Sequence, residues 1–126
     1  MDLKGIIKRD IELSGDITES VHNFIKDLKE FINAFALRED NVLKELRIAL
    51  NFFKMPNVGR ALGPEGISAY FMARIMDMVK FYIVHDVGDV IRKAKRVGYS
   101  LEAVLNYPNV DVDKVFLIVK EELKKS

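Results

Sequence analysis

Apolar residues recur along this chain at intervals of three and four positions, and strict alternation of apolar and polar residues is almost absent. Intervals of three and four are the period of an α-helix, whereas alternation is typical of a strand, so the pattern predicts an all-α protein. The clearest stripe lies in a predicted helix over residues 17–37. Its members are Val21, Phe24, Ile25, Leu28, Phe31, Ile32 and Phe35. Such a continuous stripe predicts lengthwise packing against other helices, as in a bundle.

Glycine, proline and polar clusters separate further predicted helices over residues 3–14, 41–54 and 67–85, with a loop over residues 55–66. The helix over 67–85 is the most apolar, so we expect it at the centre. Three charged residues interrupt its apolar run, which favours a buried helix over a membrane span. The length suffices for one hydrophobic core, and we expect residues 1–126 to form a single all-helical domain.

The predicted helix over residues 41–54 is apolar on most of its circumference. Its main face is expected in the core, while Ile48, Phe52 and Met55 form a second ridge. A helix with two apolar faces either crosses the core or contacts a partner chain. This surplus apolar surface predicts an interface at these three residues and a homodimer.

The C-terminal part is predicted to form a lobe of short helices over residues 87–97, 101–107 and 112–124. Glycine at position 98 is expected to form the turn of a helix-turn-helix-like segment, residues 90–109. Serine at position 100 is expected to cap the second of these helices. The first carries four cations, which are Arg92, Lys93, Lys95 and Arg96. Such a block can contact phosphates, so nucleic acid is one possible partner. The other interpretation is a solvated helix face, since cations are favoured near a helix C-terminus.

The sequence His85-Asp86-Val87-Gly88 resembles the His-Asp dipeptide of the HD phosphohydrolase superfamily, an all-helical metal-dependent fold. The resemblance implies an earlier histidine, for which His22 is available, and a later aspartate, for which Asp111 or Asp113 could serve. It also implies a divalent metal that activates water for attack on phosphate. The alternative is structural, with the aspartate at position 86 capping the next helix.

Other candidate chemistry is weaker. Glu19 and His22 have the Glu-x-x-His spacing of di-iron bundles, but that site needs the motif twice and the second copy is missing. The glycine-rich loop lacks the Gly-Lys-Ser/Thr of a phosphate-binding loop. We therefore assign no catalytic residue, and expect neither a metal nor a cofactor.

Composition narrows the setting. The chain has no cysteine, which excludes disulfides, thiolate metal sites and cysteine nucleophiles and favours a cytoplasmic protein. The net charge of +1 provides no global attraction to nucleic acid or membranes, so electrostatic binding requires a local patch. Low glutamine and cysteine with abundant lysine and glutamate is thermophile-like, although seven asparagines argue the other way.

The sequence thus predicts a small helical interaction or scaffold protein that is not an enzyme and forms a homodimer. The sequence also leaves two alternatives open. One is a nucleic-acid-binding protein that uses the basic block, and the other is an HD-like metal phosphohydrolase.

Overall fold

The computed structural model describes residues 15–83 and 86–125, and all regular elements in these ranges are helical. They are α2 (Gly15–Ala34), α3 (Glu39–Lys54), α4 (Pro56–Asp77), the short 3-10 helix η1 (Phe81–Ile83), α5 (Val87–Leu105) and α6 (Val112–Lys124). The predicted all-α bundle is therefore confirmed. The helix predicted over residues 3–14 lies outside the described residues.

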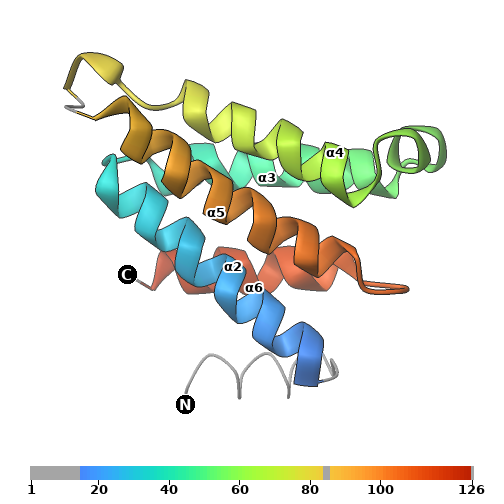
Figure 1. Cartoon of the computed structure of the whole chain (residues 1–126). Helices are drawn as coiled ribbons and strands as arrows, with labels where there is room; N and C mark the ends of the chain where they lie inside the picture. Colours follow the sequence, from blue (N-terminus) through green and yellow to red (C-terminus); the bar gives the residue numbers. More distant parts are fainter. Residues whose placement is uncertain (1–14, 84–85, 126) are drawn as a thin grey trace.

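Helix α5 lies between α2 and α4 and packs along both, while α3 packs against α4, and α6 against α3 and α2 (Figure 1). Polar contacts show that α2 and α5 are antiparallel. Ser20, near the start of α2, contacts Tyr107, just beyond the end of α5, whereas Glu30, near the end of α2, contacts Arg96 in the middle of α5. Helix α4, which contains most of the expected central helix over residues 67–85, packs against both α3 and α5.

The stripe that the sequence predicts on α2 forms part of the core, together with buried residues of α3, α4, α5 and α6. All its members are buried except Phe35, which is half-buried against the same core. The rings of Phe24 and Phe71 lie 6.2 Å apart, so α2 and α4 contribute to one core. Each large apolar side chain removed from water in this way stabilises the fold by about 1.5–3 kcal/mol.

The segment predicted as a loop over residues 55–66 is almost entirely helical, which corrects that prediction. Met55 alone separates α3 from α4, and Pro56 occupies the first turn of α4, where its missing N–H costs nothing. A Cβ at Gly59 would lie 2.1 Å from the carbonyl oxygen of Phe53, so only glycine allows this close junction. At Gly63 the backbone leaves the helical region, with φ 65° and ψ −179°, and α4 bends there (Figure 1).

Two further helix boundaries differ from the prediction. Helix α4 ends at Asp77 rather than near residue 85, and η1 follows. Helix α5 runs without interruption through Gly98, so the helix-turn-helix-like segment and its lobe of short helices are wrong. Gly98 is buried against Met72 of α4 and stays helical because the packing of α5 between two helices outweighs its weak helix propensity. Within the described ranges, no helix is both long and apolar enough to cross a membrane.

Candidate functional site

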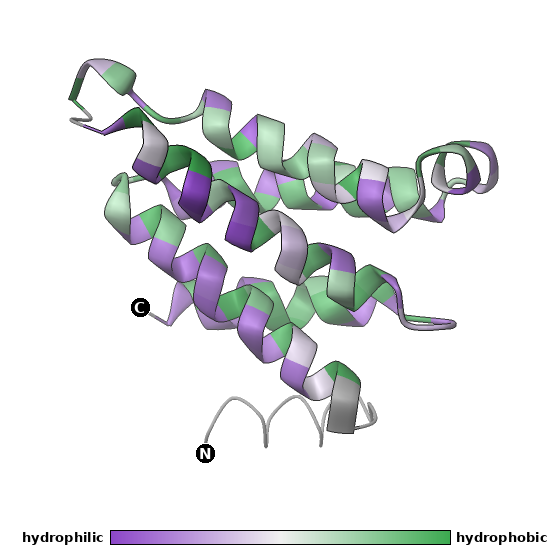
Figure 2. Ribbon diagram, in the orientation of Figure 1, coloured by the Kyte–Doolittle hydropathy of each residue, from purple (hydrophilic) through white to green (hydrophobic). Residues whose placement is uncertain are grey.

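One end of the bundle carries a cluster of exposed apolar side chains, which we call the apolar tip: Phe81, Tyr82, Ile83, Val87 and Ile91. The first three form η1 and the other two lie on the first turns of α5. Tyr82 is 83% exposed and Ile83 is 57% exposed. Figures 1 and 2 show η1 and the start of α5 projecting together from this end of the molecule. Clustered exposure of this kind is typical of a binding surface, whereas single exposed apolar residues are normal.

A hollow of about 220 Å³ lies beside the apolar tip. The turn after α2, the start of α3 and the end of α4 form its walls, and Ile83 belongs to both the hollow and the tip. Its other lining residues are Phe35, Ala36, Leu37, Arg38, Asn41, Met78 and Lys80. The hollow is therefore apolar inside, with two cations among its lining residues.

The base of the apolar tip is fixed by a cap on α5. A carboxylate oxygen of Asp86 accepts a hydrogen bond from the backbone N–H of Asp89, which confirms the predicted capping role. The other oxygen accepts a bond of 3.2 Å from the Arg92 guanidinium. These bonds favour the ionised carboxylate, and the Arg92 bond is the larger cause of a pKa for Asp86 below its ordinary value.

The predicted basic block is largely neutralised within the chain. Arg92 pairs with Asp86, Lys93 pairs with Asp89, and Arg96 pairs with Glu30 of α2 at 3.3 Å. Lys95 makes no ion pair within the described ranges and lines a cleft between α4 and α5 instead. The four cations share one continuous helix, and no second helix of a helix-turn-helix accompanies them.

The predicted interface on α3 is partly covered by the chain itself. The Phe52 ring packs edge-on against Tyr70 of α4, with 5.4 Å between ring centroids. Ile48 is half-buried, and Met55 is 48% exposed. Part of the second apolar face predicted on this helix is therefore buried in the contact between α3 and α4. The homodimer interface at these residues stays a prediction.

The residues of the HD-like set are not brought together in the part that the structure describes. Residue 85 lies outside the described residues, Asp111 caps α6, and Asp113 pairs with Lys54 at 2.7 Å. His22 lies on α2 with a buried Nδ1 that has no hydrogen-bond partner among the described residues. Across residues 15–83 and 86–125, no three histidine, aspartate or glutamate side chains are grouped as metal ligands.

A basic groove, which sequence analysis missed, runs between α3 and α6. We define it by four cations, Lys44, Arg47, Lys120 and Lys124, which face a single carboxylate, Asp40. The groove encloses about 310 Å³. The intervals of three and four place these cations on one stripe of each helix. The tertiary structure shows that the two stripes face each other, and the spacing of the residues alone does not show this.

The groove cations are only partly paired. Arg47 lies over the Phe116 ring at 4.4 Å from its centroid, a cation–π contact, and Lys124 lies 3.9 Å from Asp40. Lys44 and Lys120 form no ion pair with any residue of the described ranges and are exposed. The groove therefore offers positive charge to a ligand through these two lysines.

No family model matches the chain, and neither a curated protein nor a solved structure matches it significantly.

Proposed function

We propose that the protein is a non-enzymatic interaction protein that forms a homodimer through its apolar tip. The observation that supports this proposal is the concentration of five large exposed apolar side chains at one end of the bundle, beside a hollow lined by apolar residues. Burying such a patch is favourable, because apolar surface leaves water.

A two-fold dimer requires a surface that is complementary to itself. The tip and the hollow meet this requirement because they are adjacent and differ in shape. In a two-fold arrangement, Tyr82 of one copy enters the hollow of the other, and the reverse contact forms at the same time. Each interface then contains two such insertions.

Charge also suits this pairing. The hollow carries Arg38 and Lys80, and an aromatic ring that enters it gains cation–π contacts. Tyrosine is among the residues that contribute most to interfaces, since it buries a large rigid ring and keeps a polar hydroxyl. We therefore expect Tyr82 to contribute more to dimer formation than the other tip residues.

Sedimentation equilibrium over a range of protein concentrations tests the proposal. The wild-type chain should approach twice its monomer mass of 14.4 kDa as the concentration rises. The double variant Tyr82→Ser/Ile83→Ser should lose about 2 kcal/mol or more of dimerisation free energy, which is about a thirtyfold rise in Kd. Neither side chain belongs to the buried core, so the variant should keep its helical circular dichroism.

Leu117→Ser is the matched control, because Leu117 is a large apolar residue of α6 that is 59% exposed and lies outside the tip. The control should dimerise like the wild type. A wild-type chain that stays monomeric at all concentrations would overturn the proposal, as would a dimer that the tip variant leaves intact.

A second candidate function is supported by the basic groove. Cations on two facing helices can follow a phosphate backbone, and contacts of this kind provide affinity without reading the bases. In this alternative the protein binds nucleic acid through α3 and α6 rather than through the basic block of α5.

Fluorescence anisotropy with a labelled duplex DNA distinguishes the two locations. Lys44→Ala/Lys120→Ala should weaken binding and lower the slope of log affinity against log salt by about 2, since two phosphate contacts are lost. Arg92→Ala/Arg96→Ala removes two cations that are already paired and should have a smaller effect. Equal losses for both variants would remove the groove as the binding site, and no binding by the wild type would remove this function.

A further inference from the structure

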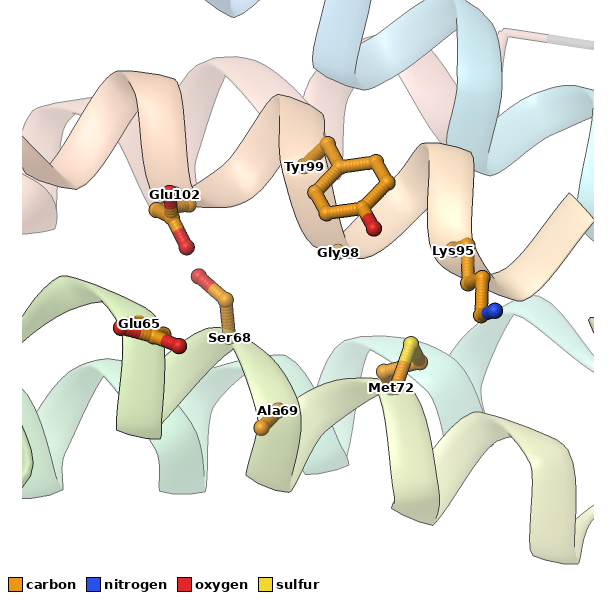
Figure 3. Close-up of a pocket in the computed structure, with 8 residues that line it drawn as sticks. All are labelled: Glu65, Ser68, Ala69, Met72, Lys95, Gly98, Tyr99 and Glu102. Atoms are coloured by element: carbon orange, nitrogen blue, oxygen red, sulfur yellow. The ribbon is translucent and has the colours of Figure 1, made fainter.

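A cleft between α4 and α5 encloses about 170 Å³. This volume is below the ~300 Å³ at which clefts begin to hold drug-sized ligands, so its occupant must be small. The polar residues that line the cleft are Glu65 and Ser68 of α4, and Lys95, Tyr99 and Glu102 of α5 (Figure 3).

Ser68 is an unusual residue for a helix interface. The residue is only 3% exposed, and its hydroxyl has no hydrogen-bond partner among the described residues. Figure 3 shows the hydroxyl pointing away from the α4 backbone into the space between the two helices. A buried hydroxyl without a partner is unfavourable, and a ligand that supplies a hydrogen bond removes this penalty.

The charges in the cleft are separated along its length. Glu65 and Glu102 lie with Ser68 at one end, and Lys95 lies at the other, beside Met72 (Figure 3). None of the three charged side chains forms an ion pair with a residue in the described part of the chain. Lys95 precedes Glu102 by seven positions on one helix, which corresponds to about 10 Å along the axis.

The middle of the cleft is apolar. The Tyr99 ring provides a surface for an alkyl chain between the two ends, and Met72 extends this apolar surface to the Lys95 end (Figure 3). Gly98 leaves space because it has no side chain. The two carboxylates and the serine hydroxyl at one end suit a cationic donor such as an ammonium group, and the lysine at the other end suits a carboxylate.

We propose that this cleft binds a small ω-amino acid, in which an ammonium group and a carboxylate stand at opposite ends of a short alkyl chain. The ammonium group donates to Glu65, Ser68 and Glu102, the alkyl chain lies against Tyr99, and the carboxylate faces Lys95. This site is independent of the apolar tip and of the basic groove.

Titration of the full chain with 6-aminohexanoate, followed by two-dimensional amide NMR, tests the proposal. Hexylamine and hexanoate are the matched probes, since each carries only one of the two charged groups. We expect shifts confined to residues around the cleft and the tightest binding for 6-aminohexanoate, with hexylamine weaker and hexanoate weakest. Binding of hexanoate as tight as that of 6-aminohexanoate, or shifts located elsewhere, would overturn the assignment.

Variants test each end separately. Glu102→Gln should weaken 6-aminohexanoate binding about tenfold, since a charged hydrogen bond is lost. Because Glu102 is half-buried, Glu65→Gln provides the same test at an exposed position. Lys95→Gln should reduce 6-aminohexanoate binding to the level of hexylamine and leave the binding of hexylamine unchanged.

Ser68→Ala should weaken 6-aminohexanoate binding without lowering Tm, because no hydrogen bond within the described chain is removed. Glu121→Gln, on exposed α6 surface, is the control, and equal binding by all of these variants would refute the site.

Discussion

Single residues of α5 show where local sequence patterns predict the structure correctly and where they do not. Gly98 resembles a turn residue in the sequence, yet it is helical and buried against Met72. Ser100 resembles a cap, yet its hydroxyl donates a hydrogen bond to Asp27 of α2. At both positions, contacts with a neighbouring helix outweigh the local preference of the residue for a turn or a cap. By contrast, Asp86 caps α5 as predicted, because a cap depends only on the next three residues.

Substitution of Gly98 provides a direct test of the continuous helix. A Cβ at this position would lie 3.4 Å from the Met72 sulfur, an ordinary van der Waals distance. Gly98→Ala should therefore raise the free energy of unfolding by up to about 1 kcal/mol, as expected for alanine replacing glycine inside a helix. Urea unfolding monitored by circular dichroism measures the change. A marked loss of stability would instead indicate a glycine-dependent turn.

At the scale of elements, the residues at which helices begin and end are harder to predict than the presence of the helices. The 3.6-residue period persists beyond Asp77, but the side chains of η1 find no helix to cover them and stay exposed. The region around Pro56 and Gly63 looked like a loop, because proline and glycine usually interrupt helices. Here proline begins α4, and only Gly63 departs from helical geometry.

The bend in α4 depends on the backbone of Gly63. Its positive φ lies in a region that is essentially restricted to glycine. Apart from its chain neighbours and the adjacent helix backbone, no atom of the described residues lies within 4 Å of the place where a Cβ would stand. Gly63→Ala should therefore lower the free energy of unfolding by about 1–3 kcal/mol through backbone strain alone. Thermal unfolding measures this loss. Full retention of Tm in this variant would show that the bend tolerates ordinary backbone angles.

At the scale of the whole molecule, the sequence identified the members of the core better than their arrangement. The stripe of α2 is buried as predicted, since a continuous apolar stripe leaves little choice. The position of α5 between α2 and α4 was missed, because periodicity shows which face of a helix is apolar but not which helix covers it. The same limit explains why the facing cations of α3 and α6 were not recognised as one groove.

The candidate site was missed for a related reason. Phe81, Tyr82 and Ile83 belong to an apolar run that predicted a buried central helix, and only the tertiary fold shows them at an uncovered end. Conversely, Phe52 was predicted at an interface, and part of its surface is covered by Tyr70. Composition and periodicity therefore give the amount of apolar surface, while the fold decides where it remains exposed.

The apolar tip also determines where a protease should first cut this chain. Chymotrypsin cleaves after aromatic residues in segments that can become extended, and Phe81 and Tyr82 stand in a three-residue helix between α4 and α5. Tyr99 is also 68% exposed, but it lies inside α5 and is protected by the regular helix. Brief digestion should therefore cleave the chain at η1. The rate of this cleavage should fall as the protein concentration rises, because a second copy that covers Tyr82 in the dimer blocks access of the protease to this site.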